Sequence, residues 1–389
     1  MTIASADPRA AELLSQYRPE DASFLASPAG TMLAEGVYCP VPPSGRAEGL
    51  ADLPLRVDAV LRVAEAAGHD VRTVVGAVPF APDADARLVV PARLLRGEPL
   101  PPYAGPPRVA PRVPDWGWGG DPQFTGAVER AVRHIRAGRY DKVVLARSVR
   151  VTVPGFEPAA VVRALAGRDG RAYTFGVGLG GGRTLLGASP ELLVSRRGRT
   201  VTANPLAGSA ARSADPAEDE RRAAALLRSA KDRHEHALVR DAVAEALRPF
   251  CRTLDVPEEP VLTRTPAMWH LSTTVTGEVA DPSISSLALA VALHPTPAVC
   301  GTPTPAARSA IAELEPFDRG FYTGMVGWTD ADGDGEWAVT IRCAVADGEG
   351  LDLFAGAGIV ADSDPEAETA ETTAKLGTVL AALGLSDVA

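Results

Sequence analysis

Strand-like and helix-like segments follow one another in this sequence without the regular alternation that a parallel sheet requires. After Asp121, an amphipathic helix precedes the alternating segment 141–153, and two more strand-like segments, 171–179 and 183–194, enclose the turn GLGGGR. Long helices are predicted over 216–250 and 364–384, the second with Asp364 as its N-cap, Pro365 in its first turn and Gly384 after its end. Runs of antiparallel strands with separate helices are typical of the α+β class.

The chain divides into two regions by composition. Residues 1–97 are mixed, with a helical period over 57–68 and strand-like segments at 73–80 and 87–91. The segment 98–114 is dense in proline and is expected to be an extended connector. We therefore predict an N-terminal α+β region over 1–114, which completes the fold, and a second region over 115–389, which carries the motifs described below.

Charge and composition exclude several classes of protein. The chain has 39 Lys and Arg against 49 Asp and Glu, a net charge of −10, which argues against a nucleic-acid binder. The N-terminus lacks a cationic start and an apolar run, so no export is predicted. The longest uncharged run, 282–307, is broken by prolines, so we expect a buried helix and an ordered loop instead of a membrane span. Four scattered cysteines indicate reduced thiols in a cytoplasmic protein.

Three local patterns imitate ligand sites but fail in context. The glycines of 176–182 lie between two strands with no helix after them, unlike a dinucleotide-binding turn. The sequence DADGDG at 330–335 begins like a calcium loop, but its twelfth position is Ile341, so a hairpin turn is predicted. His234 and His236 are two residues apart on a helix and do not face each other, which argues against zinc.

Two pairs of acidic residues repeat the same helical spacing. Asp232 and Glu235 are three residues apart on one predicted helix, and Glu368 and Glu371 are three apart on another, so each pair projects from one face. Carboxylates on two helices suit a hard cation such as Mg²⁺, which keeps some waters and takes a substrate carboxylate as well. The alternative is a solvated acidic face, since Glu371 also precedes Lys375 by four residues, a common surface pairing. Spacing by itself leaves both interpretations open.

Eight further segments, taken together and in order, closely resemble the chorismate-utilising enzymes, and specifically the siderophore-pathway isochorismate synthases. The resemblance covers about residues 121–385, and the first hundred residues match only loosely. The segments are KVVLAR (142–147), GASPELLV (187–194), PLAGSA (205–210), KDRHEHALV (231–239), LHPTPAVCG (293–301), ELEPFDRGFYTGMVGW (313–328), GEWAVTIRCA (335–344) and LFAGAGIV (353–360).

The resemblance implies a fold and a ligand set. The fold would be that of anthranilate synthase component I, in which two large antiparallel β-sheets pack together with helices outside and the active site lies in a deep cleft. The ligands would be chorismate and Mg²⁺. Glu235 and Glu371 would bind the metal directly, and Asp232 and Glu368 would act through water.

The resemblance also assigns the residues that bind the substrate. Arg342 would take the enolpyruvyl carboxylate, for which a planar bidentate donor is suited. The backbone of Ala207, Gly208 and Ser209 would lie against the ring carboxylate, and His270 would line the substrate. The remaining expected substrate-binding residues are Thr296, Ala298, Tyr322, Gly356, Gly358 and Lys375.

The implied reaction adds water at C2 of chorismate and expels the C4 hydroxyl, so it needs a base on one ring face and an acid on the other. Lys142 would be the base, which must be neutral, so burial and the nearby metal are expected to lower its pKa. Glu191 would be the acid, with a pKa raised by an enclosed setting rich in carboxylates. Without the motifs, each would be interpreted as an ordinary residue at the start of a strand or helix.

Individual positions discriminate among relatives. Lys142 favours water over ammonia as the nucleophile. The relatives that use ammonia resemble one another in having a different residue at this position. No amidotransferase signature is present either. Ala298, with Ile341 and Phe354, resembles the isochorismate type, whereas Tyr322 also matches salicylate synthases. Ala211 stands where an arginine is frequent; Arg212 is retained, so we expect little consequence.

The sequence therefore predicts a Mg²⁺-dependent isochorismate synthase, a cytoplasmic isomerase (EC 5.4.4.2) that reversibly converts chorismate to isochorismate for 2,3-dihydroxybenzoate, siderophore or related secondary metabolism. We expect a monomer with no nucleic-acid, membrane or amidotransferase partner. The alternatives are a salicylate synthase, which releases pyruvate from isochorismate, and a non-catalytic chorismate-binding relative. Retention of Lys142, Glu191, Arg342 and the four carboxylates argues against the latter.

Overall fold

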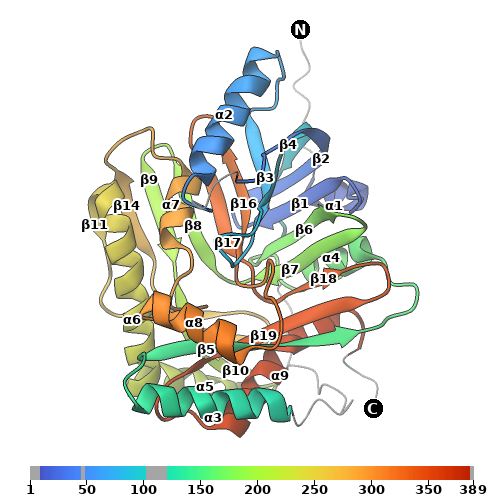
Figure 1. Cartoon of the computed structure of the whole chain (residues 1–389). Helices are drawn as coiled ribbons and strands as arrows, with labels where there is room; N and C mark the ends of the chain where they lie inside the picture. Colours follow the sequence, from blue (N-terminus) through green and yellow to red (C-terminus); the bar gives the residue numbers. More distant parts are fainter. Residues whose placement is uncertain (1–8, 45–48, 102–120, 386–389) are drawn as a thin grey trace.

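Most strands of the protein belong to one continuous antiparallel sheet. The computed structural model describes residues 9–44, 49–101 and 121–385, so most of the expected connector lies outside the described residues. Within these ranges, sixteen strands follow the order β11-β14-β9-β8-β17-β16-β3-β4-β2-β1-β6-β7-β18-β19-β5-β15, and β10-β13-β12 form a small separate sheet (Figure 1).

The strands of the large sheet are β1 (Ala22–Ser27), β2 (Gly30–Pro40), β3 (Thr73–Val78), β4 (Arg87–Gly97), β5 (Lys142–Val151), β6 (Tyr173–Gly180), β7 (Arg183–Ser189), β8 (Leu192–Arg197), β9 (Thr200–Asn204), β11 (Cys251–Asp255), β14 (Val275–Val279), β15 (Gly301–Thr302), β16 (Met325–Asp330), β17 (Gly335–Val339), β18 (Cys343–Ala346) and β19 (Leu351–Ile359). The small sheet has β10 (Leu206–Ala211), β12 (Val261–Arg264) and β13 (Met268–Ser272). The helices are α1 (Ala10–Gln16), α2 (Leu53–Ala66), α3 (Pro122–Arg136), α4 (Pro158–Ala166), α5 (Pro216–Arg228), α6 (Ala230–Leu247), α7 (Ser286–Leu293), α8 (Thr304–Leu314) and α9 (Pro365–Ala382), with a 3₁₀ turn at Arg248–Phe250.

The two halves of the large sheet pack against each other, because one buried apolar cluster joins them. Its members include Ala77, Val326 and Ala338 from β3, β16 and β17, and Phe175 and Phe354 from β6 and β19. The expected pair of large sheets is thus joined into one sheet, and the α+β class is confirmed. Strands β4, β2 and β1 connect the two halves, so residues before the proline-rich segment pair within the same sheet as residues after it.

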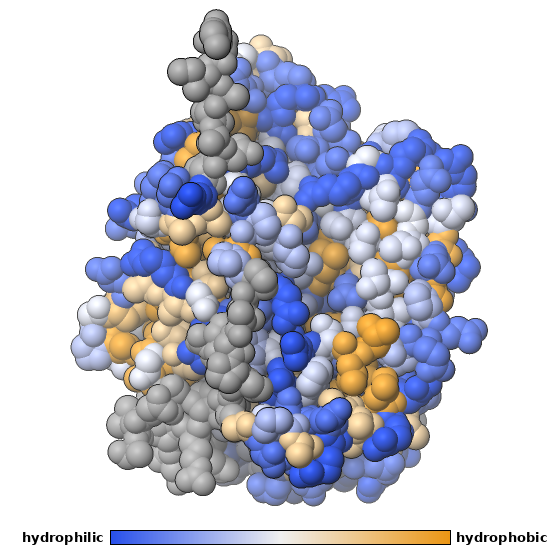
Figure 2. All heavy atoms as spheres, turned by 180° about the vertical axis from the view of Figure 1, so that it is seen from behind, coloured by the Kyte–Doolittle hydropathy of each residue, from blue (hydrophilic) through white to orange (hydrophobic). Residues whose placement is uncertain are grey.

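Helices cover the outer faces of both halves. Helices α2, α6 and α7 pack in one apolar cluster with β3, β8 and β17. Helices α1, α4 and α9 pack in another with β1, β7, β18 and β19, while α3 and α8 enclose β5. Figure 2 shows, on the reverse face, hydrophilic side chains among smaller apolar areas. In the described ranges, no helix combines the length and the apolarity needed to span a membrane.

The predicted helix over 216–250 is wrong in its continuity. Ser229 interrupts it with an extended backbone, and its Oγ accepts the amide hydrogen of Asp232 as an N-cap. Helix α6 therefore begins just before Asp232 and Glu235 and can take its own direction. The predicted strand over 183–194 is also interrupted, at Pro190 and Glu191, between β7 and β8. The first interruption lies directly before the turn that carries Asp232, and the second includes Glu191, so both lie at or next to predicted site residues.

Both predicted ends of α9 and both predicted hairpin turns are confirmed. Asp364 caps α9 through the amide of Ala367, and Gly384 has a φ of 73° after its end. The glycine-rich turn joins β6 to β7 as a hairpin. The turn at 330–335 joins β16 to β17 and uses Asp330 to accept the amide hydrogens of Asp332 and Asp334.

Candidate active site

One cavity, of about 900 Å³ including the open space at its mouth, brings together nearly all of the predicted site residues. Its walls come from α6, α9, β10, β13 and β19 and from the connections that follow β7 and β17. The predicted residues that line it are Glu191, Ala207, Gly208, Ser209, Asp232, Glu235, His270, Ala298, Tyr322, Arg342, Gly356, Gly358, Glu368, Glu371 and Lys375. Lys142 and Thr296 lie just behind this wall, where Lys142 contacts Glu235 and Thr296 accepts the amide hydrogen of Val299. Segments far apart in the sequence thus converge on one site.

Lys142 begins β5 and is almost completely buried, with 1% of its side chain exposed. Its Nζ donates a hydrogen bond to Oε1 of Glu235, 2.7 Å away. Gly358 on β19 lies against this pair, since a Cβ at Gly358 would stand 2.9 Å from Glu235 Oε1 and 3.0 Å from Lys142 Cε. The absence of a side chain at Gly358 therefore lets lysine and carboxylate meet at the wall of the cavity.

The second predicted metal ligand is also paired with a lysine. On α9, Lys375 Nζ lies 2.6 Å from Glu371 Oε1 and donates to the carbonyl of Gly356. Burial acts to raise the pKa of Glu371, but Lys375 and Arg342 together lower it below its ordinary value. One turn earlier, burial raises the pKa of Glu368. Two carboxyl groups on α9, those of Glu368 and Glu371, thus have pKa values that are shifted in opposite directions.

The four carboxylates fit a divalent cation by their chemistry. All are oxygen donors, they come from α6 and α9, and they line one cavity. Among the described residues, no three acidic, histidine or cysteine side chains are already arranged around a common point as metal ligands. Such a donor set suits an ion that completes its shell with waters and a substrate carboxylate. Lys142 and Lys375 already form ion pairs with Glu235 and Glu371. A cation bound here would interact with the same two carboxylates.

Glu191 occupies the interruption between β7 and β8, where 3% of it is exposed. Its carbonyl accepts the amide hydrogen of Val339, and its own amide donates to Ser189 Oγ. Burial raises the pKa of its carboxyl to about 7, against the lowering effect of the Leu206 amide, Lys142 and Arg342. The carboxyl is thus poised to hold or release a proton near neutral pH, as the sequence predicts for Glu191.

Arg342 follows β17 with a φ of 53°, a backbone region that non-glycine residues rarely adopt. Within the described chain, its guanidinium makes no hydrogen bond or ion pair with another side chain, although Glu371 and Glu191 lie near enough to act on its charge. Burial lowers the pKa of Arg342. A cation with unused donors in an enclosed cavity is a suitable anchor for a substrate carboxylate.

His270 on β13 stands opposite Ser209 on β10, next to a bulge at Gly208. Gly208 has a φ of 78°, and a Cβ there would lie 3.0 Å from the Cβ of Asp232, so glycine permits this close approach to α6. Burial lowers the pKa of His270 to about 3, and its Nε2 has no hydrogen-bond partner among the described residues. A neutral imidazole whose Nε2 has no partner in the described chain therefore belongs to the cavity wall.

The positions that discriminate among relatives also meet here. Tyr322 lines the cavity with Ala298 and Ile341, and its ring stacks on Phe354 at a centroid distance of 5.2 Å. Phe354 supports Tyr322 from behind. These four positions can therefore influence the shape of the cavity, which is the expectation behind their use in discriminating among relatives.

Similarity to known proteins identifies the family. The family model described as "Chorismate binding enzyme" matches residues 119–384. The chain belongs to the chorismate-binding enzyme family. It is 50% identical over 394 residues to isochorismate synthase DhbC of Bacillus subtilis (strain 168), with 98% of each chain covered.

Solved structures agree with the described fold of this chorismate-binding enzyme. The putative 2,3-dihydroxybenzoate-specific isochorismate synthase DhbC from Bacillus anthracis has a TM-score of 0.89 at 48% identity, covering 97% of this chain and 100% of that one. Anthranilate synthase component I from Streptococcus pneumoniae TIGR4, at 22% identity, shares the fold with a TM-score of 0.65, covering 93% of this chain and 91% of that one. The resemblance found in the sequence is thus confirmed.

Sequence reasoning missed a buried ion pair that supports the site. Glu315 and Arg319 lie 2.5 Å apart, each with 2% of its side chain exposed. Arg319 donates to the carbonyls of Val144 and Val299 and to Thr323 Oγ1, while Glu315 accepts the amide hydrogen of Ala146. Both residues stand in the quoted segment 313–328, but only the fold shows that they connect β5 to the loop of Ala298.

Lys231 and Thr323 are further wall residues that the sequence analysis did not single out. Lys231 precedes Asp232 in the segment 231–239, and its charge acts on Glu368 and Glu371. Thr323 has a φ of 57° and follows Tyr322. A lysine beside a predicted acidic ligand was a signal in the sequence, whereas the unusual backbone of Thr323 was not.

Proposed function

We propose that the protein is an isochorismate synthase, an isomerase that converts chorismate to isochorismate reversibly. The observation that carries the proposal is one cavity wall with Glu191 on it and Lys142 directly behind it. The same wall holds four carboxylates and Arg342, whose guanidinium has no side-chain partner among the described residues. Similarity to isochorismate synthase DhbC over 98% of the chain supports the same function.

The proposed reaction assigns one proton transfer to each of two side chains. Lys142, in its neutral form, takes a proton from the water that attacks C2. Glu191, in its protonated form, gives a proton to the C4 hydroxyl, which leaves as water while both ring double bonds shift by one position. One water enters and one leaves, so substrate and product are isomers. The raised pKa of Glu191, about 7, supports its role as the acid.

We further propose that catalysis depends on Mg²⁺ held by Glu235 and Glu371, with Asp232 and Glu368 acting through water. The ion supplies positive charge against the carboxylates of substrate and protein when it is bound. Arg342 would anchor the enolpyruvyl carboxylate, and the backbone at Ala207, Gly208 and Ser209 the ring carboxylate. The other residues of the cavity wall would hold the ring between acid and base.

Salicylate synthase is the second candidate, and Tyr322 is the residue that favours it. Ala298, Ile341 and Phe354 favour the isochorismate type, and all four positions meet at or directly behind one cavity wall. We propose that the enzyme acts as a monomer without an amidotransferase subunit and supplies 2,3-dihydroxybenzoate, siderophore or related secondary metabolism. The Bacillus anthracis relative, described as 2,3-dihydroxybenzoate-specific, supports this pathway.

The deciding experiment incubates the purified protein with chorismate, with and without Mg²⁺. Products are resolved by chromatography, and pyruvate is assayed separately. Isochorismate in equilibrium with chorismate, without enzyme-dependent pyruvate, is the expected result. Salicylate with equimolar pyruvate would establish the salicylate synthase instead. A protein that binds chorismate but forms no product with or without Mg²⁺ would be a non-catalytic relative.

A further inference from the structure

Thr323 has a backbone conformation that its own side chain disfavours. Its φ is 57°, and a β-branched residue in this left-handed region is an outlier. The residue is 1% exposed and lines the candidate active site next to Tyr322. Such a conformation persists only where the surrounding structure fixes it, and residues of this kind gather at functional sites. The contacts that fix Thr323 therefore indicate its role.

The hydroxyl of Thr323 is bonded within the protein on both sides. Its Oγ1 accepts a hydrogen bond from Nη1 of Arg319, 3.1 Å away, and donates to the carbonyl of Tyr322 at 2.6 Å. The single hydroxyl hydrogen is thus already used, although the residue lies in the cavity wall. Thr323 therefore serves to place other groups.

Arg319 connects this hydroxyl to the strand of the proposed base. Its Nη2 donates to the carbonyl of Val144 at 2.7 Å, two residues after Lys142 on β5. Its Nη1 also donates to the carbonyl of Val299 at 2.9 Å. Because the guanidinium is a rigid plane with donors in fixed directions, its bond to Thr323 fixes that residue relative to β5.

The backbone of Thr323 holds the segment that carries Arg342. Its amide donates to the carbonyl of Thr340 at 2.7 Å, and the Thr340 amide donates back to the carbonyl of Gly324 at 2.9 Å. Arg342 follows two residues later with a φ of 53°, and within the described ranges it is the other non-glycine residue in the left-handed region. The two unusual backbones thus belong to segments that are hydrogen-bonded to each other.

The segment around Thr340 is also where the chain crosses between the two halves of the large sheet. Before it, β17 pairs with β16 and β8, and after it, β18 pairs with β7 and β19. At the end of β17, the amide of Val339 donates to the carbonyl of Glu191 at 3.1 Å. The proposed acid and the proposed carboxylate anchor therefore both depend on a segment that Thr323 holds.

We propose that Thr323 is a positioning residue, which holds the proposed acid and the proposed carboxylate anchor at a set distance from the proposed base. It does so without touching the reacting atoms. This inference rests on the proposed function, because Glu191, Arg342 and Lys142 act as acid, anchor and base only in that reaction. The outlying backbone of Thr323 follows from joining both sides of the cavity at one residue.

Two substitutions test the hydroxyl. Thr323→Val keeps the shape and the β-branch but loses the hydroxyl, so turnover per folded molecule should fall about tenfold to a hundredfold through misplacement of the reacting groups. The KM for chorismate should stay within about threefold, since no group that would bind a substrate carboxylate is removed. Thr323→Ser keeps the hydroxyl and should retain turnover within about threefold of the parent.

Thr323→Gly separates positioning from stability. Glycine adopts a φ of 57° readily, so this variant should be at least as stable to urea as Thr323→Val. It has no hydroxyl, so its turnover should be as low as that of Thr323→Val. Urea unfolding at the assay temperature gives the folded fraction of each variant. A merely structural role would lower this fraction and leave turnover per folded molecule unchanged in all three variants, and that result would overturn the proposal.

A control variant and the parent complete the experiment. Thr200→Val changes an exposed threonine of β9 that does not line the cavity, and it should leave turnover and KM unchanged. A parent that forms no isochorismate would refute the proposed function and this inference with it. A parent that forms isochorismate, together with unchanged turnover in Thr323→Val, would refute the inference alone.

Discussion

Lys142 Nζ and Glu235 Oε1 lie 2.7 Å apart at the wall of the cavity, so the proposed base and a proposed metal ligand form one ion pair. The lysine end of this pair is buried, with 1% exposed, and the glutamate end is 18% exposed. The pair connects the proposed proton transfer to the proposed metal binding. Lys142 can act as a neutral base only if its ion pair with Glu235 loosens. A cation bound at Glu235 would compete with Lys142 for the same carboxylate oxygen.

Lys142→Ala should lower turnover by about 10²- to 10⁴-fold, because it removes the base. Chorismate binding should remain measurable, since no residue proposed to bind the substrate carboxylates is changed. Turnover and calorimetric binding are measured side by side, with Arg139→Ala as an exposed control at the same end of β5. Turnover within a few-fold of the parent would remove Lys142 from the role of base.

Glu371→Gln should raise the Mg²⁺ concentration needed for half-maximal activity, because an amide is a poorer ligand for a hard cation than a carboxylate. The same change also frees Lys375 from its ion pair. A magnesium titration of activity measures the shift, and Glu366→Gln, exposed in the first turn of α9, is the matched control. If both variants titrate like the parent, Glu371 does not hold the ion.

The raised pKa of Glu191 leads us to expect a specific pH dependence of activity. An acid with a pKa of about 7 is protonated below that pH and loses its proton above it, so turnover should fall on the alkaline side. The pH profile of turnover at saturating chorismate checks this. The alkaline limb should disappear in Glu191→Gln, whose residual activity is low and does not depend on this proton. An alkaline limb that persists in Glu191→Gln would belong to another group.

The same carboxyl also affects stability. Its pKa is raised by burial from the ordinary 4.5 to about 7, so between these values the folded protein keeps a proton that the unfolded chain has lost. The contribution of Glu191 to the free energy of unfolding therefore falls as the pH rises through this window. Glu191→Gln should be more stable than the parent above pH 7, and this advantage should shrink as the pH falls from about 7 to 4.5. Denaturant unfolding at several pH values measures it; an advantage independent of pH would contradict the linkage.

Breaking the ion pair of Glu315 and Arg319 should destabilise the fold. Glu315→Gln leaves the charge of Arg319 buried without its partner, at a cost of about 3–5 kcal/mol. Replacing both residues, by Gln and Met, should recover part of this loss because no unpaired charge remains. Urea unfolding of the single and double variants provides the comparison. Equal stability of Glu315→Gln and the parent would show that the pair contributes nothing net.

The sequence by itself determined the α+β class, the two ends of α9, the two hairpin turns, and most of the residues that line the cavity. These depend on local signals: Asp364 and Pro365 begin α9, and Phe124, Val128 and Val132 form the buried face of α3. The break at Ser229 was missed because the helical propensity on both sides outweighs one serine, and the capping bond to Asp232 is visible only in the folded chain.

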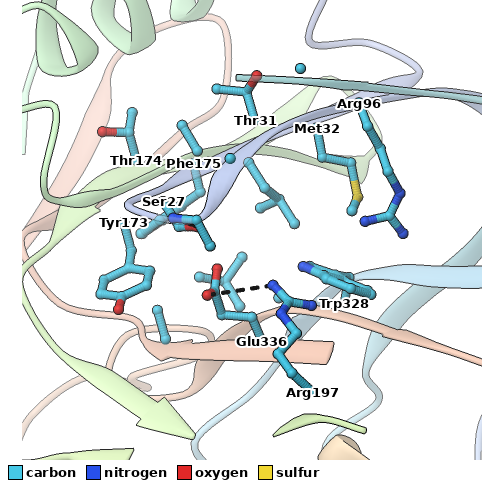
Figure 3. Close-up of a pocket in the computed structure, with 18 residues that line it drawn as sticks. Ser27, Thr31, Met32, Arg96, Tyr173, Thr174, Phe175, Arg197, Trp328 and Glu336 are labelled. Carbon is cyan, nitrogen blue, oxygen red and sulfur yellow. Dashed lines mark hydrogen bonds and ion pairs between the residues drawn. The ribbon is translucent and has the colours of Figure 1, made fainter. Parts of the chain in front are cut away.

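Only the tertiary structure decided which of these residues touch. The sequence alone does not show that Lys142 contacts Glu235, that Glu315 contacts β5, or that Arg197 contacts Trp328 (Figure 3), because the members of each pair are far apart along the chain. Each contact depends on how the strands are ordered in the large sheet, which places β17 beside β8 and β4 between β3 and β2. Strand order results from packing of the whole core, because local sequence fixes only the alternation of faces and leaves the choice of partner strand open.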